Sequence, residues 1–280
     1  TASPELCGNC HDEQSPYGAW VKATYREWKA GPYAANGIRC QDCHMQYAPG
    51  KSAGMGPERE DVAHHVFHGP HFDQKLQGAI DLALYTDDPR PRSGSNVVIR
   101  AVLFNGKAGH YVPSGSSEER MLWLELQVKD NSGNSTRIPV DPKGFEEESY
   151  TIADSEEVAY QAMGEIMEVA GYSGVSRDGI VPDGSRIFRR PYFDPMGRMT
   201  ICQWFTEKNT AIDYRIGPQE TKVETYTWAI PEQFPSGTAT VTATLYYSLV
   251  PSSVGKFMEL PAYSYEPKLV NTASLDVEIR

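Results

Sequence analysis

From residue 96 onward, the apolar positions of the chain recur at every second residue. In the run 122–128, Leu and Val alternate with Trp, Glu and Gln, and the turn-forming sequence of residues 130–134 follows. A second run spans residues 240–249 after a Pro-Ser-Gly turn, and residues 224–230 and 275–279 are further candidates. Short strands rich in Thr, Val and Tyr between Gly and Pro turns predict an antiparallel β-sandwich.

The first 94 residues have a different pattern, in which apolar positions recur every three or four residues. This spacing predicts one helix over residues 17–28, before a Gly-Pro pair, and another over residues 71–85. Residues 87–95 have the composition of a linker. We therefore expect two domains, 1–94 and 95–280, the second with an irregular or helical insertion around 142–200. Within that insertion, residues 154–170 have a helical pattern with acidic residues in the first turn.

Composition excludes several classes of protein. The chain has 280 residues, of which 40% are hydrophobic and 22% charged, and no apolar run reaches the eighteen residues that a membrane span needs. The formal net charge of −11 makes nucleic acid and anionic membranes poor partners. The same charge would accelerate the approach of a cationic partner.

Two identical cysteine arrangements identify the candidate chemistry. They are Cys7-Gly-Asn-Cys10-His11 and Cys40-Gln-Asp-Cys43-His44. Two thiols three positions apart can add to the two vinyl groups of one porphyrin, and the histidine that follows can coordinate the iron. The sequence therefore predicts two covalently bound haems c, with His11 and His44 as proximal ligands.

Two other uses of these cysteines fit less well. Zinc sites of the finger type rarely place histidine directly after each cysteine pair, and twenty-nine residues separate Cys10 from Cys40. A disulfide framework would distribute its cysteines along the chain, whereas four of the five cluster near the start. The fifth, Cys202, is expected to be a buried thiol with no catalytic role.

The remaining histidines also cluster near the two cysteine pairs. Two haems need up to two further axial ligands, and five histidines are available, none of them beyond residue 110. Iron coordination explains this distribution better than isolated structural roles do. The candidates are His64, His65, His68, His71 and His110.

Several segments resemble bacterial multihaem c-type cytochromes. The segment from Tyr25 through Cys40-Gln-Asp-Cys43-His44-Met45, followed by His65-Val-Phe-His-Gly69, is similar to the haem segment of that family. Gly109-His110-Tyr-Val-Pro113-Ser-Gly115 is similar to the Gly-His-x-x-Pro-Thr-Gly segment that opens its β domain. The likeness covers most of the chain.

The resemblance implies that His65 and His110 are the distal iron ligands, with His110 arriving from the β domain. His68 and His71 remain alternative distal ligands. This chain departs from the family pattern at Gly31 and Ser114, which replace Ser and Thr, and at Tyr33, in a position that can hold an axial His in relatives. Tyr33 is then either a hydrogen-bond donor beside a haem edge or a packing residue.

These observations predict an α+β protein in which a small irregular and helical dihaem domain precedes a larger antiparallel β-sandwich domain. The expected function is electron transfer between redox protein partners, which include other multihaem cytochromes or copies of this chain. The alternatives are a haem enzyme with one open iron that acts on a small nitrogen, sulfur or peroxide species, and a subunit of a larger redox assembly or filament. Thioether-bound haem is made outside the cytoplasm, so we expect an exported chain, with its signal peptide removed, in the periplasm or at the cell surface.

Overall fold

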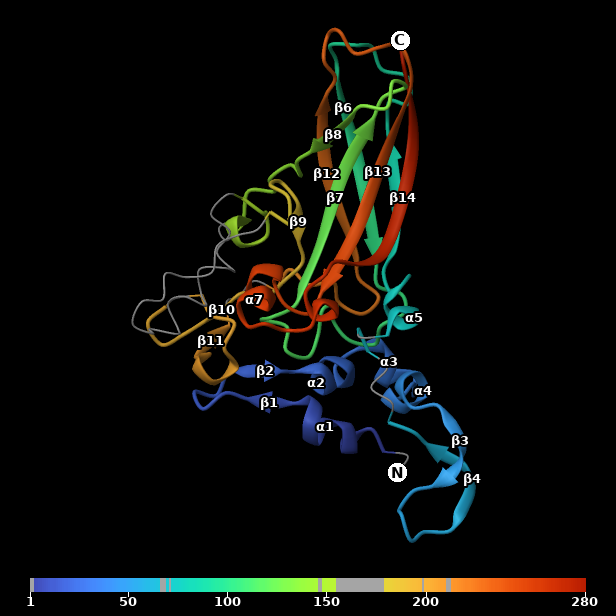
Figure 1. The fold of residues 1–280 in the computed structure, drawn as a ribbon, viewed down its shortest axis with the longest axis vertical. Coiled ribbons are helices and arrows are strands. Elements are labelled where there is room, and N and C mark those ends of the chain that lie inside the picture. Colours follow the sequence, from blue (N-terminus) through green and yellow to red (C-terminus); the bar gives the residue numbers. More distant parts are fainter. Residues whose placement is uncertain are drawn as a thin grey trace.

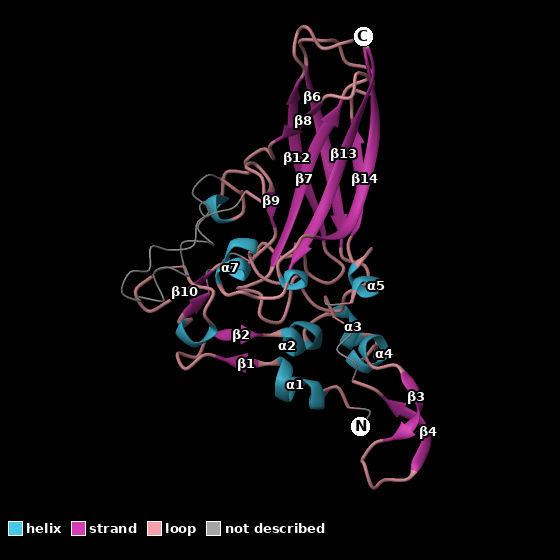
Figure 2. Ribbon diagram, viewed as in Figure 1, coloured by secondary structure: helices cyan, strands magenta, loops and turns pink. Residues whose placement is uncertain are grey.

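The structure is a computed structural model that describes residues 3–65, 69–70, 72–145, 148–154, 179–197, 199–209 and 213–280. Two antiparallel sheets form the larger part of the molecule, and the amino-terminal segment lies across one end of them (Figure 1, Figure 2). The predicted helix over residues 154–170 falls almost entirely outside the described residues.

Each sheet is built from strands that are distant in the sequence. The first has the order β12-β6-β5, with β5 (Asp81–Thr86), β6 (Asn96–Phe104) and β12 (Thr221–Ala229). The second has the order β14-β13-β7-β8, and β9 also pairs with β7. Its strands are β7 (Met121–Lys129), β8 (Ser135–Ile138), β9 (Arg186–Ile187), β13 (Gly237–Ser248) and β14 (Lys268–Ile279).

One hydrophobic core fills the space between the two sheets. Alternate residues of β6 and β13 are buried, as a strand with one face toward a core requires. Ile99 of the first sheet and Leu124 and Val241 of the second are fully buried in the same cluster. The antiparallel sheets predicted from the period of two are therefore confirmed, and each fully buried aliphatic side chain contributes about 2 kcal/mol of transfer free energy.

The amino-terminal segment consists of short helices and two hairpins. Its elements are α1 (Glu5–His11), β1 (Glu13–Gln14), β2 (Trp20–Lys22), α2 (Thr24–Lys29), α3 (Pro32–Ala35), α4 (Cys40–His44), β3 (Tyr47–Lys51), β4 (Glu58–Ala63) and α5 (Asp73–Leu76). The β3–β4 hairpin extends away from the sheets (Figure 1).

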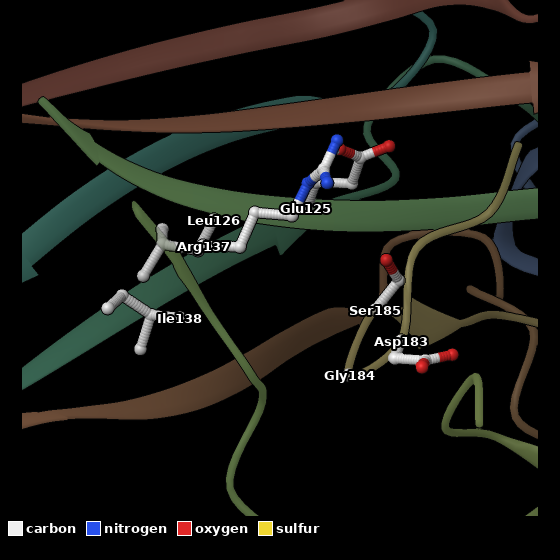
Figure 3. A pocket seen from close by; sticks show the side chains of 7 residues that line it. All are labelled: Glu125, Leu126, Arg137, Ile138, Asp183, Gly184 and Ser185. Atoms are coloured by element: carbon white, nitrogen blue, oxygen red, sulfur yellow. The ribbon is translucent and has the colours of Figure 1, made fainter. Parts of the chain in front are cut away.

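Short elements connect the strands of the larger part. They are η1 (Glu148–Tyr150), β10 (Tyr192–Phe193), η2 (Gln203–Phe205), β11 (Lys208–Asn209), α7 (Ser252–Phe257) and η3 (Ala262–Ser264). Among the described residues, no helix is both long and apolar enough to cross a membrane. A shallow pocket lies between β7, β8 and the loop before β9 (Figure 3), and its lining includes the ion pair of Glu125 with Arg137 but no residue of the amino-terminal segment.

Both helices predicted from four-residue spacing are corrected in part. Residues 20–22 form β2, and only residues 24–29 are helical, because Trp20 and Lys22 pair with the preceding strand β1. Of the described residues 72–85, only 73–76 are helical. Residues 81–86 form β5, which pairs with β6, so this strand lies in the first sheet although it precedes residue 94.

Candidate functional site

The first Cys-x-x-Cys-His segment is helical in the structure. Cys7 and Cys10 lie three residues apart on α1, so their side chains share one face of the helix. A Cβ atom on Gly8 would lie 2.9 Å from a ring carbon of Tyr25, so only glycine allows α2 to pack this closely against α1. The segment thus presents two thiols and the imidazole of His11 around one turn.

The second segment forms α4 in the same way. Asp42 accepts a hydrogen bond from the backbone N–H of Arg39 at 2.8 Å and so satisfies a donor at the start of the helix. At the other end, the ammonium group of Lys75 donates to the carbonyl of Cys43 at 2.7 Å. These contacts fix the helix that holds Cys40, Cys43 and His44.

The two segments meet at their first cysteines. Cys40 lies close enough to Cys7 for the two thiols to interact electrostatically. Burial, together with the proximity of Cys7, raises the pKa of the Cys40 thiol to about 12. All five cysteines of the chain are free in this structure, and Cys202 is half-buried rather than buried as the sequence predicts.

The histidine of each Cys-x-x-Cys-His segment lies near a second histidine. The ring centres of His11 and His65 are 6.5 Å apart, and those of His44 and His110 are 6.3 Å apart with 24° between their planes. Burial, followed by the nearby charges of His65 and His110, lowers the pKa of His11. A lowered pKa favours the neutral imidazole, which is the form that binds a metal.

These separations fit one metal ion between the two rings of each pair. Metal–imidazole nitrogen distances are about 2 Å, and a ring centre lies about 1 Å behind its nitrogen, so two rings on one metal have centres roughly 6 Å apart. The thiols of α1 and α4 lie beside the same histidines, which is the donor set of a thioether-bound haem. The residues present therefore fit two haems.

Of the other histidines, one belongs to neither pair and two are not described. The ring of His64 lies over Gly50 in the hairpin, 3.6 Å from the position of an added Cβ. His68 and His71 lie outside the described residues.

Several contacts fix the ring and the backbone of His110. Its Nδ1 atom lies 2.8 Å from the carbonyl oxygen of Tyr111, and its own carbonyl accepts a hydrogen bond from the side-chain amide of Asn105 at 3.0 Å. Gly109 packs under Tyr33, where an added Cβ would lie 3.2 Å from the ring. No role for Asn105 could be predicted from the sequence, where the residue is notable only as the first member of a turn-forming Asn-Gly pair.

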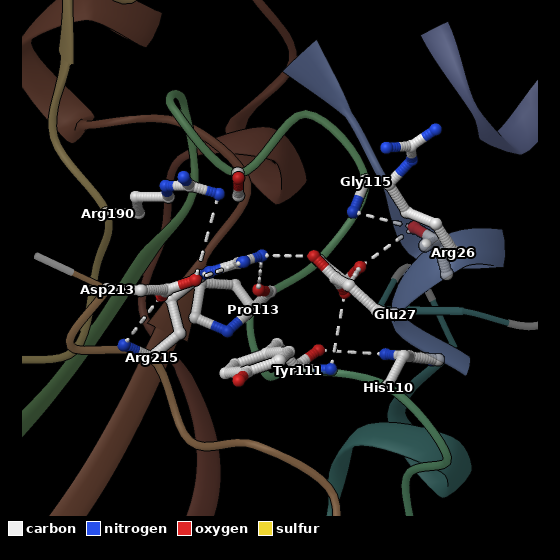
Figure 4. A network of polar contacts seen from close by, with 12 residues as sticks. Arg26, Glu27, His110, Tyr111, Pro113, Gly115, Arg190, Asp213 and Arg215 are labelled. Carbon is white, nitrogen blue, oxygen red and sulfur yellow. Dashed lines mark hydrogen bonds and ion pairs between the residues drawn. The ribbon is translucent and has the colours of Figure 1, made fainter. Parts of the chain in front are cut away.

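A buried ion pair connects α2 with the His110 segment (Figure 4). Arg215 and Glu27 lie 2.8 Å apart, with 2% and 7% of their side chains exposed. The second oxygen of Glu27 accepts hydrogen bonds from the hydroxyl of Ser114 at 2.7 Å and the backbone N–H of Tyr111 at 3.3 Å. Sequence reasoning did not identify Glu27 or Arg215, because nothing local in the sequence indicates which charges will pair.

Tyr33 is half-buried between the amino-terminal segment and the β domain. Its hydroxyl donates to the carbonyl of Gly106 at 2.6 Å and accepts from the side chain of Gln219 at 3.1 Å. Both partners belong to loops that border the first sheet, so the residue contributes to docking of the two parts.

Comparison with known proteins identifies a similar fold but no family. No protein-family model matches the chain, and no curated protein matches it. A penta-heme cytochrome c552 from Thermochromatium tepidum has a similar structure, with a TM-score of 0.65 and 23% identity, over 98% of this chain and 56% of that chain. The chain thus has a multihaem cytochrome-like fold, and it spans little more than half the length of that protein.

Other solved structures are similar only to a slight degree. The CARDB domain of the PF1109 protein from Pyrococcus furiosus has a TM-score of 0.27 and 11% identity, over 72% of this chain and 87% of that chain. The N-terminal domain of the Streptococcus gordonii adhesin Sgo0707 has a TM-score of 0.29 and 13% identity, over 72% of this chain and 33% of that chain.

Proposed function

We propose that this chain is a dihaem c-type cytochrome that transfers electrons between redox proteins outside the cytoplasm. The observation that supports it most is the placement of a second imidazole opposite each Cys-x-x-Cys-His helix, at 6.5 Å and 6.3 Å between ring centres. Each haem would supply one iron that cycles between the ferric and ferrous states.

In this proposal, Cys7 and Cys10 would hold one haem, and His11 and His65 would ligate its iron. Cys40 and Cys43 would hold the other haem, and His44 and His110 would ligate its iron. Two imidazoles on each iron leave no open position for a small ligand, which favours electron transfer over catalysis on a bound substrate. The contact between Cys7 and Cys40 supports an arrangement in which the two haems are close enough for electrons to pass directly between them.

The partners would be other redox proteins, including further multihaem cytochromes or copies of this chain. The similar structure from Thermochromatium tepidum is described as penta-heme, whereas this chain contains two Cys-x-x-Cys-His segments. Thioether attachment takes place outside the cytoplasm, so the proposal includes export to the periplasm or the cell surface.

A haem count and a low-temperature paramagnetic resonance spectrum of the oxidised protein test the proposal together. We expect two haems per chain by pyridine haemochrome, both ferric and low-spin, and little spectral change on addition of cyanide or nitrite. A high-spin spectrum from about one haem per chain would instead favour an enzyme with one open iron. Fewer than two haems would contradict the attachment scheme.

A further inference from the structure

We propose that Glu27 is a positioning residue for the axial imidazole of His110. This inference rests on the proposed function, since it concerns a ligand of the second haem. Glu27 lies on α2 of the amino-terminal segment, whereas His110 lies in a loop of the β domain. The carboxylate of Glu27 accepts a hydrogen bond from the backbone N–H of Tyr111, the residue that follows His110.

The direction of the His110 ring depends on the backbone of Tyr111. Nδ1 of His110 lies 2.8 Å from the carbonyl oxygen of Tyr111, so Nδ1 carries the proton in this contact and Nε2 is left as the free nitrogen. This carbonyl belongs to the peptide group between Tyr111 and Val112, so a rotation of that group would rotate the ring or break the hydrogen bond, and Glu27 holds the chain on both sides of it, at the N–H of Tyr111 and at Ser114. The geometry at Tyr111 thus controls where Nε2 points.

Glu27 accepts hydrogen bonds from two residues of the short segment that follows His110. One oxygen accepts from the N–H of Tyr111 at 3.3 Å and from the hydroxyl of Ser114 at 2.7 Å. The neighbouring Thr24 extends the contact, because its hydroxyl lies 2.8 Å from the Ser114 hydroxyl and accepts from the N–H of Gly115 at 3.0 Å. The loop that contains His110 is therefore attached to α2 along much of its length (Figure 4).

Arg215 keeps the Glu27 carboxylate in place from the other side. It lies 2.8 Å from Glu27 and 2.7 Å from Asp213, donates to the carbonyl of Pro113 at 3.1 Å, and stacks over the Tyr111 ring at 4.8 Å. Because Glu27 and Arg215 are both buried, an uncharged replacement of Glu27 removes one of the two carboxylates that neutralise Arg215 and leaves Asp213 as the other. The pair therefore has a defined geometry rather than a fluctuating one.

The decisive variant is Glu27→Gln, which keeps the size of the side chain. A carboxamide has one oxygen and one NH2 group, whereas Glu27 accepts from Arg215 at one oxygen and from Tyr111 and Ser114 at the other, so in either orientation the NH2 group faces a donor. We expect at least about a tenfold increase in the fraction of ferrous haem that binds carbon monoxide, at one haem per chain, because a hydrogen bond to a charged group is lost. A ferric high-spin signal from the same haem should accompany it.

The matched control is Glu224→Gln. Glu224 is also a fully buried partner of an arginine, since it lies 2.9 Å from Arg186, but its contacts are within the β domain. Both substitutions should lower the unfolding midpoint, whereas only Glu27→Gln should change the spin state of a haem. An equal spectral change in both variants would mean that general destabilisation opens the iron, and it would overturn the inference.

A second variant decides the matter if Glu27→Gln does not fold. Ser114→Ala removes one hydrogen bond to Glu27 without leaving an unpaired charge, and we expect a smaller increase in carbon monoxide binding at the same haem. Haem content by intact mass confirms that each variant is fully loaded. Low-spin spectra and no carbon monoxide binding in whichever of the two variants folds would overturn the positioning role.

His110→Ala separates failure of this inference from failure of the proposed function. If His110→Ala opens one haem and Glu27→Gln opens none, only the positioning role is wrong. If His110→Ala leaves both haems low-spin, the ligand assignment itself is wrong, and the inference falls with it. Opening of the same haem in both variants supports the two proposals together.

Discussion

Cys40 lies so close to Cys7 that the Cys7 thiol raises the Cys40 pKa, although thirty-two residues separate the two positions along the chain. Each is the first cysteine of its segment, so the two candidate attachment sites are neighbours. Because the cysteines of the two segments lie on separate helices, α1 and α4, loss of one site does not remove the residues that form the other.

The double variant Cys40→Ala and Cys43→Ala should lose one haem and keep the other. Its intact mass should show a single haem addition that survives extraction with acidified acetone, because thioether bonds resist that treatment. Cys202→Ala, which changes the half-buried cysteine outside both segments, is the control and should retain two. Loss of both haems from the double variant would mean that attachment at the two sites is interdependent.

Substitution of the two facing histidines should open two different irons. His65→Ala should leave the haem of His11 five-coordinate, and His110→Ala should do the same to the haem of His44, each with a higher reduction potential because a strong axial donor is lost. Added imidazole should restore the low-spin spectrum in both. His64→Ala is the control, and a low-spin spectrum in His65→Ala would transfer the role to His68 or His71.

Tyr33→Phe should reduce stability and leave the haem spectra unchanged. The substitution removes one hydrogen bond to Gly106 and one from Gln219, at an expected cost of about 1–2 kcal/mol in the free energy of unfolding by urea. Tyr17→Phe, at a position that is 51% exposed, should cost almost nothing. A shifted reduction potential in Tyr33→Phe would show instead that the hydroxyl acts on a haem.

Because Glu118 is protonated in the folded protein, the free energy of unfolding should fall as the pH rises toward 8. Burial, with a smaller effect of the Glu119 charge, raises the pKa of Glu118 to about 8 in the folded protein. The folded state therefore binds a proton that the unfolded state releases near pH 4.3, and the stability that depends on this proton is full below about pH 4 and lost as the pH rises through 8.

The comparison of Glu118→Gln with the wild type tests this sign. A glutamine resembles the protonated acid at every pH. The free energy of unfolding of the variant, minus that of the wild type, should therefore increase by on the order of a few kcal/mol between about pH 4 and pH 8. Urea denaturation at a series of pH values measures the difference. Glu232→Gln, at an exposed position, controls for the chemical change itself. A difference that does not vary with pH would mean that Glu118 is ionised in the folded protein.

The sheets could be predicted from the sequence because their pattern is local. The alternation of Leu124, Leu126 and Val128 with Glu125 and Gln127 reflects the pleat of a strand, and β7 forms where it indicates. The prediction of a helix over residues 71–85 was wrong in part for the same reason, because the pattern is local. Leu76, Ile80 and Leu84 are four residues apart, which satisfies a helical period, but four is also a multiple of two, and pairing with β6 made residues 81–86 a strand.

Only those residues of the candidate site that belong to a sequence motif could be predicted from the sequence. The cysteine pairs specify attachment and proximal ligands, whereas the distal positions came from a resemblance and still require the variants described above. The contact of Glu27 with Arg215 joins residues 188 positions apart, and no period or motif indicates such a pairing. Long-range ion pairs of this kind depend on the assembled fold.

The loop that contains His110 has a consequence for the biogenesis of the protein. Val112 and Ile216 exchange backbone hydrogen bonds at 2.9 Å and 3.0 Å, so this loop reaches its final shape only when residue 216 has been made and folded. His11 and His65, by contrast, are both present once the first 65 residues have emerged. In the proposed scheme, one iron would be saturated early in maturation and the other late, and the spectrum of the second would report whether the β domain has been completed.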